Sequence, residues 1–95
     1  MDVEILPHAR AELINAVEYY EREHSGLGVR FWNEVDRSIE WIANHAAVPR
    51  LRPSGYRRVN LRVFPFYVAY VIRERVRVVA IAHVRREPEF WLEAP

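Results

Sequence analysis

Apolar residues in the first half of the chain recur at spacings of three and four positions. This spacing places them on one stripe of an amphipathic helix and predicts a first helix over residues 8–24. After a break at residues 25–28, a second stripe predicts another helix that ends near residues 44–49. The two stripes are Ala9, Leu13, Ala16, Val17 and Tyr20, then Phe31, Val35, Ile39 and Ile42. The pattern therefore predicts a helical hairpin, and most of its acidic side chains are expected to be solvated.

In the second half the period changes to two, which is typical of β-strands. Within residues 57–63, positions 59, 61 and 63 are apolar and positions 58, 60 and 62 are polar, so this segment predicts a strand with one polar face. Residues 66–72 and 76–83 are apolar on both faces and predict two buried central strands. The short charged link at residues 73–75 joins them as an antiparallel hairpin. Residues 3–6 predict a short first strand.

The predicted order is β, α, α, β, β, β. It indicates an α+β fold in which the helical hairpin packs on one face of a small, curved, mostly antiparallel sheet. Residues 50–55 predict a loop, and residues 85–91 an irregular tail or a single helical turn. Because 95 residues is the size of one domain, residues 1–95 are expected to form a single unit.

The composition is that of a globular protein, with 51% hydrophobic and 28% charged residues, and zero cysteines exclude disulfides and thiolate zinc sites. The longest apolar stretch, residues 64–72, is about half of what a membrane span needs. The first residues carry acids where a secretory signal carries bases. The histidines lack metal-ligand spacing, and dinucleotide and phosphate-loop signatures are absent. We therefore expect a cytoplasmic protein with no membrane span, no metal and no cofactor.

The net charge of +1 conceals an asymmetry along the chain. Residues 1–48 hold nine acids and four arginines, a balance of −5, whereas residues 49–95 hold ten arginines and four acids, a balance of +6. The basic half predicts a surface that attracts a polyanion, either nucleic acid or an acidic peptide. The alternative is a solvated polar face that serves only solubility.

Four arginines are the candidate target- or phosphate-binding residues. Arg58 and Arg62 stand four positions apart on one predicted strand, so their side chains are expected to point the same way. Arg85 and Arg86 follow the last strand and are expected to converge with the first pair across the sheet. Together they predict a concave cationic surface.

His83 is the candidate catalytic residue, because histidine transfers protons near neutral pH. The alternative is a hydrogen-bonded core histidine, since His83 ends a buried strand. His8 and Glu12, four positions apart, predict a helix-surface pair rather than a metal site. The aromatic residues of the helices are interpreted as packing residues; these are Tyr19, Tyr20, Trp32 and Trp41.

Several short motifs follow one another along nearly the whole chain. They are Glu18-Tyr19-Tyr20-Glu21, Gly26-Leu27-Gly28 followed by Arg30-Phe31, Arg57-Arg58 with Leu61, Phe64-Pro65-Phe66 with Tyr70, and His83-Val84-Arg85-Arg86-Glu87-Pro88 with Trp91. This set in this order resembles the RelE/ParE toxin superfamily of bacterial type II toxin–antitoxin systems. The resemblance implies a small growth-arresting toxin held inactive by a cognate antitoxin in a hetero-oligomer. It also implies that operator DNA is contacted only through the antitoxin.

The superfamily divides by target. RelE-like members cut messenger RNA in the ribosome, whereas ParE-like members act against DNA gyrase. RelE-like ribonucleases often carry a tyrosine or histidine near the carboxy terminus, where this chain has Phe90, which cannot transfer a proton. Only His83 and Tyr56 remain as proton carriers on that side. The resemblance therefore favours a ParE-like gyrase inhibitor without catalysis; the alternatives are a RelE-like ribosome-dependent endoribonuclease and a plain interaction or nucleic-acid-binding module.

Overall fold

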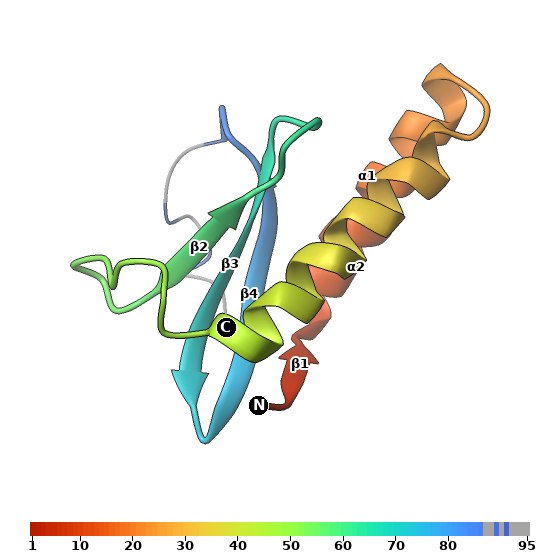
Figure 1. Ribbon diagram of the computed structural model, residues 1–95. Helices are drawn as coiled ribbons and strands as arrows, with labels where there is room; N and C mark the ends of the chain where they lie inside the picture. Colours follow the sequence, from red (N-terminus) through yellow and green to blue (C-terminus); the bar gives the residue numbers. More distant parts are fainter. Residues whose placement is uncertain (87–88, 90, 92–95) are drawn as a thin grey trace.

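The structure is a computed structural model that describes residues 1–86, 89 and 91 of the chain (Figure 1). Its elements are β1 (Val3–Ile5), α1 (Pro7–Glu23), α2 (Leu27–His45), β2 (Arg57–Asn60), β3 (Phe66–Arg73) and β4 (Arg75–His83). This order confirms the predicted succession of strands and helices. No helix in the described part of the chain is long and apolar enough to cross a lipid bilayer. Of the predicted tail, residues 87, 88 and 90, and with them Phe90, lie outside the described residues.

The two helices form a hairpin, and a glycine turn with a glutamate clamp sets how closely they approach (Figure 1). Gly26 has a φ of 88°, a left-handed conformation that glycine adopts readily and other residues rarely do. The carboxylate of Glu21 accepts hydrogen bonds from the backbone N–H groups of Gly26 (2.9 Å) and Gly28 (3.0 Å). It thereby satisfies donors that the first turn of α2 leaves without partners. The predicted break is shorter than residues 25–28, because α2 already begins at Leu27.

The four strands form one mixed sheet in the order β1-β4-β3-β2. β1 pairs with β4 in parallel, and the other two neighbouring pairs are antiparallel. The predicted α+β fold, with the helical hairpin on the sheet, is confirmed. The predicted tight link between the central strands is confirmed as well, and Glu74 in this link has a φ of 67°.

The strand predicted over residues 57–63 is too long, because β2 ends at Asn60. Beyond it the chain turns: the N–H of Leu61 donates to the carbonyl of Phe66 (2.9 Å), and the N–H of Phe66 donates to the carbonyl of Phe64 (2.8 Å). A proline between the two phenylalanines has no N–H with which to extend the ladder. The apolar alternation after Asn60 therefore belongs to a turn that still sends Leu61 and Phe64 into the core.

The main core lies between the helical hairpin and the sheet. Four aromatic rings pack there with centroids 4.8 to 6.0 Å apart; they belong to Tyr20, Phe31, Phe64 and Phe66. Tyr70 is fully buried beside them and donates its hydroxyl to the carbonyl of Ala46 (2.7 Å). The predicted packing role is thus confirmed for Tyr20, whereas Tyr19, whose ring meets that of Tyr20 at 5.2 Å, and Trp32 are about half exposed.

A second cluster covers part of the opposite face of the sheet. Its floor consists of small side chains, Ala69, Ala80 and Ala82, and Trp91 packs over them at 6% exposure. The register of β3 against β4 shifts by one residue, so that Ala69 pairs with Ala80 but Tyr70 with Val78. This irregularity inverts the alternation of β4 halfway along the strand. Both faces of β4 are consequently apolar, as the sequence predicts.

Candidate functional site

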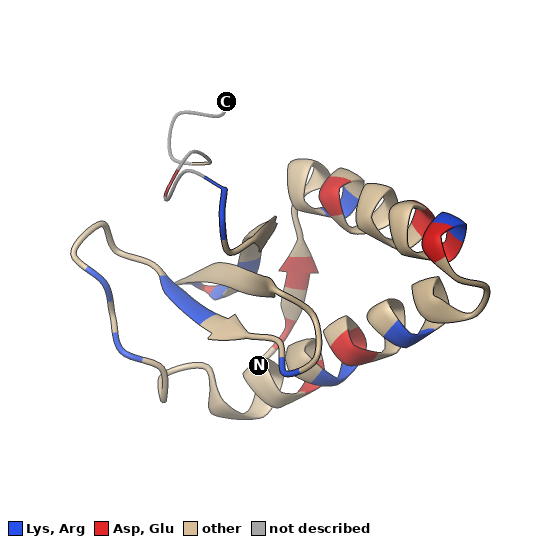
Figure 2. Ribbon diagram, turned by 90° about the horizontal axis from the view of Figure 1, so that it is seen from above, with Lys and Arg blue, Asp and Glu red and all other residues tan. Residues whose placement is uncertain are grey.

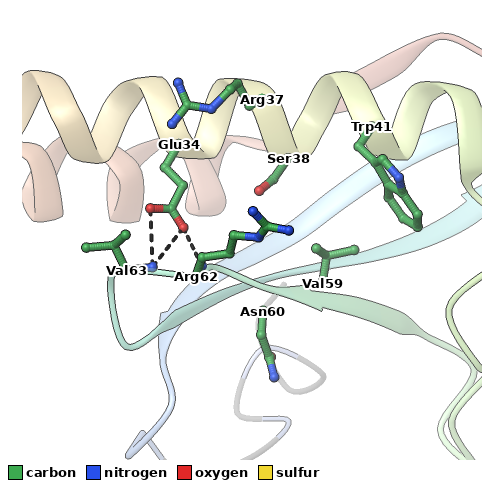
Figure 3. Close-up of a pocket in the computed structure, with 8 residues that line it drawn as sticks. All are labelled: Glu34, Arg37, Ser38, Trp41, Val59, Asn60, Arg62 and Val63. Carbon is green, nitrogen blue, oxygen red and sulfur yellow. Dashed lines mark hydrogen bonds between the residues drawn. The ribbon is translucent and has the colours of Figure 1, made fainter.

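An open groove lies between α2 and the chain that runs from β2 into the following turn (Figure 3). Its volume is about 550 Å³, and its lining residues are Glu34, Arg37, Ser38, Trp41, Val59, Asn60, Arg62 and Val63. A smaller hollow of about 250 Å³ adjoins it, lined by Arg30, Asn33, Glu34, Arg37, Val63 and Phe64. The early end of β2 shapes this site, because the turn after Asn60 supplies the wall that faces α2.

Glu34 ties the two walls of the groove together. Its side chain is 8% exposed, and its carboxylate accepts hydrogen bonds from the backbone N–H groups of Arg62 and Val63, the latter at 3.2 Å (Figure 3). Glu34 is therefore an exception to the expectation that most acids of the hairpin are solvated. A signal exists, since Glu34 stands three positions after Phe31 and one before Val35, on the apolar stripe of α2.

Three arginines around the groove have no acidic partner in the part of the chain that the structure describes. Among the described residues, no carboxylate is within ion-pair distance of Arg30, Arg37 or Arg62. The carboxylate of Glu34 is engaged with the backbone. Arg30 and Arg37 were missed because a balance taken over residues 1–48 hides a local cluster of cations. Figure 2 shows arginines among the acids along the helices as well as on the loop before β2.

Exposed apolar side chains adjoin these arginines. Trp41 is 39% exposed and Val63 is 66% exposed, although both line the groove. The ring of Trp41 stacks on that of His45, at 4.8 Å between centroids, while part of the side chain faces the groove, so its packing is only partial. A groove that combines cations with exposed apolar surface matches a peptide that carries acidic and apolar residues together.

Arg58 and Arg62 do not share a face of the sheet, in contrast to the prediction. Arg62 follows the end of β2 and lines the groove beside α2. Arg58 lies on the opposite face, where its guanidinium stands 4.4 Å from the ring centroid of Tyr67. The expected common direction required a strand through residue 62, and the turn after Asn60 removes that condition.

Arg85 and Arg86 are exposed in the turn after β4, which β3 separates from β2. Arg86 lies close enough to Glu12 of α1 to lower the pKa of that carboxyl group. Burial is the larger effect and raises the pKa of Glu12 overall. The structure thus places Arg85 and Arg86 beyond the end of β4, and the role of all four candidate arginines stays a prediction.

The two predicted proton carriers lie apart from the groove. His83 ends β4; its Nδ1 accepts a hydrogen bond from the backbone N–H of Arg85 (3.0 Å), and its ring lies 5.3 Å from that of Phe66. Tyr56 is buried, with its ring 5.2 Å from that of Trp91. His83 is thus half-buried and makes a local contact, and its role stays a prediction.

Residues 3–88 match a protein-family model described as "ParE toxin of type II toxin-antitoxin system, parDE". The chain belongs to the ParE toxin family. The resemblance to the RelE/ParE superfamily is thereby confirmed, and this ParE-family chain is a toxin of a type II toxin–antitoxin system.

The fold of this ParE-family toxin is also found among solved structures. One described as "Chromosomal ParDE TA system from P. aeruginosa" is similar over 87% of this chain and 95% of that chain, with a TM-score of 0.76 and 14% sequence identity. At this identity the likeness shows a common fold. No curated protein matches the chain.

Proposed function

We propose that this ParE-family toxin acts in the cytoplasm, arrests growth by inhibiting DNA gyrase without catalysing a reaction, and is neutralised by a cognate antitoxin. The family match supports the class of target, and the similar structure from P. aeruginosa is described as a ParDE toxin–antitoxin system.

The positions of the residues that could transfer protons support the proposal that the toxin does not catalyse a reaction. Cleavage of RNA through its 2′-hydroxyl needs groups that accept and donate protons beside the cations that hold the phosphate. His83 is held by Arg85 and Phe66, away from the lining of the groove. The arginines of the groove stay protonated at any physiological pH and supply charge only. This arrangement favours binding over cleavage.

The charge and the apolar surface of the groove suit binding of an acidic segment of the antitoxin. Arg30, Arg37 and Arg62 present cations without acidic partners among the described residues, and Trp41 and Val63 present apolar surface between them. A peptide with carboxylates flanking apolar residues would pair with the arginines and bury both apolar side chains.

The target is tested with purified toxin freed of antitoxin. The expected result is inhibition of gyrase supercoiling or accumulation of the cleaved gyrase–DNA complex, and no cutting of messenger RNA on translating ribosomes. Codon-positioned cuts that disappear in His83→Gln would overturn the proposal and establish a RelE-like ribonuclease.

Antitoxin binding is tested separately with Arg37→Ala and Arg62→Ala. Each is expected to weaken the complex by roughly tenfold, with a smaller loss at high salt because screening reduces the wild-type attraction as well. Arg22→Ala, in the exposed last turn of α1, is the charge-matched control and should bind like wild type. Equal affinities for all four proteins would exclude the groove.

A further inference from the structure

Two arginine–tyrosine pairs stand together on the face of the sheet that is turned away from the helices. Arg58 on β2 lies 4.4 Å from the ring centroid of Tyr67 on β3. Arg52, in the preceding loop, lies 5.9 Å from the ring centroid of Tyr56, and its backbone N–H donates to the carbonyl of that tyrosine (2.8 Å). Cation–π contacts of this kind hold a guanidinium in place without neutralising its charge.

Three polar atoms of this cluster are buried without a hydrogen-bond partner among the described residues. They are the Nε atoms of Arg52 and Arg58 and the hydroxyl of Tyr67, whose side chain is 1% exposed. In the same part of the chain, no carboxylate is within ion-pair distance of either arginine. Buried donors normally find partners, because leaving them unpaired is costly. Three unpaired donors in one place therefore indicate an acceptor that binds there.

The hydroxyl of Tyr67 remains a donor at neutral pH. Burial is the largest effect on the pKa of Tyr67 and raises it; Tyr56 and Glu12 raise it further, whereas the guanidinium groups of Arg58 and Arg52 lower it. Trp91 contacts the rings of both tyrosines, so the two arginine–tyrosine pairs are neighbours on this face of the sheet. The two positive charges exceed the single negative charge of Glu12 that also acts on Tyr67, so with the neutral hydroxyl they favour an anion on this face.

We propose that Arg52, Arg58 and Tyr67 form a binding site for a phosphate group. The faces of both tyrosine rings are engaged by arginine, and Trp91 contacts the rings at 5.2 and 5.7 Å, so the rings are not open for stacking with a base. The site therefore recognises phosphate rather than base. Two guanidinium forks and a hydroxyl offer more donors than the two oxygens of a single carboxylate readily accept, which favours phosphate over an acidic side chain. This site lies outside the groove and does not depend on gyrase being the target.

The phosphate could belong to a free nucleotide or to a nucleic-acid backbone, and the chemistry of recognition is the same. The half-buried guanidinium groups would meet the ligand first. Trp91 lies beside both tyrosines, so its fluorescence should report occupancy in a Trp32→Phe/Trp41→Phe background, in which both other tryptophans are replaced.

The direct test follows the arginine Nε–Hε signals by NMR while inorganic phosphate is added at constant ionic strength. The signals of Arg52 and Arg58 are expected to shift together and to saturate, whereas that of Arg22 should not move. Arg58→Lys keeps the charge but loses the fork, and Tyr67→Phe loses the hydroxyl; each should weaken phosphate binding by roughly tenfold. Arg22→Lys is the matched control. Absence of a saturable shift in the wild-type protein would overturn the proposal without recourse to any variant.

Three further ligands decide the source and the class of the anion. A mononucleotide 5′-phosphate that binds more tightly than an oligonucleotide lacking a terminal phosphate indicates a free nucleotide, and the reverse order indicates a nucleic-acid backbone; either result supports a phosphate site. Acetate that shifts the same signals as strongly as phosphate would overturn it in favour of a carboxylate site. The gyrase and ribosome assays are not involved, so this test and that of the proposed function fail independently.

Discussion

Gly28 on α2 lies so close to Val17 on α1 that a Cβ atom at residue 28 would stand 2.6 Å from the carbonyl oxygen of Val17. That oxygen belongs to the helix backbone and cannot rotate away. Gly28→Ala is therefore expected to destabilise the protein by about 1–3 kcal/mol, because the steric cost exceeds the roughly 1 kcal/mol that alanine gains over glycine inside a helix. Urea unfolding measures the difference. Asn15→Ala, at an exposed position of α1, is the control; a Gly28→Ala protein as stable as this control would show that the helices separate freely.

The hydrogen bonds that Glu34 accepts from the backbone of Arg62 and Val63 give a second prediction. Glu34→Ala leaves the backbone N–H groups of Arg62 and Val63 without their acceptor and should lower the free energy of unfolding by about 2 kcal/mol. Glu40→Ala, an exposed acid on the same helix, should change it by less than about 0.5 kcal/mol. Chemical denaturation of both variants measures the two losses of stability. Equal losses would show that the hydrogen bonds to Glu34 do not stabilise the fold.

Glu12 should make stability depend on pH. Burial raises the pKa of its carboxyl group, and this outweighs the N–H of Ile81 (3.0 Å) and the charges of His8 and Arg86, which lower it. A carboxyl group whose folded pKa lies above its unfolded value of 4.5 stabilises the fold at low pH, and this contribution is lost as the pH rises through the raised pKa. Wild type should therefore lose stability relative to Glu12→Gln between pH 4.5 and neutrality. A difference that stays constant over this window would contradict the raised pKa.

Trp91 should contribute strongly to stability although it lies beyond the last strand. Trp91→Ala uncovers the alanine floor of the sheet and is expected to cost about 3 kcal/mol or more. Trp32→Ala, which removes a tryptophan that is already largely exposed, should cost well under half as much. Thermal unfolding of the two variants checks this; similar losses would mean that Trp91 does not pack on the sheet in solution.

The order and type of the elements could be predicted because the apolar spacing changes from 3.6 to 2 at the middle of the chain. The end of β2 could not, since Leu61 and Val63 continue the alternation while hydrogen bonds to Glu34 and Phe66 draw the backbone out of the sheet. Those partners are distant in sequence or lie beyond a turn, so the local sequence pattern does not predict these hydrogen bonds. The supposed common face of Arg58 and Arg62 was wrong for this reason.

The residues of the groove and of the proposed phosphate site could likewise be predicted only in part. Arg58 and Arg62 could be singled out from sequence, but Arg30, Arg37 and Arg52 enter only when α2 and the loop before β2 are placed against the sheet. The net charge of a stretch of sequence adds up cations that lie far apart in the folded protein. It also assigns to different stretches some cations that lie side by side in the folded protein. The hydroxyl of Tyr67, unpaired among the described residues, could not be predicted from sequence, because burial without a partner is a property of three-dimensional packing.

The parallel pairing of β1 with β4 has a consequence for the order of folding. Val3 pairs with Val76, so most of the chain separates the two paired residues in sequence. By contrast, only a tight turn separates β3 from β4. Closing the long loop costs more entropy than closing the hairpin, so the hairpin should form early and β1 should dock last. The same strand should then detach first in the native state. In hydrogen exchange, the amide of Val76, which donates to the carbonyl of Asp2 (2.9 Å), should exchange sooner than that of Val68 in the central strand, so that opening and closing of the domain begin at β1.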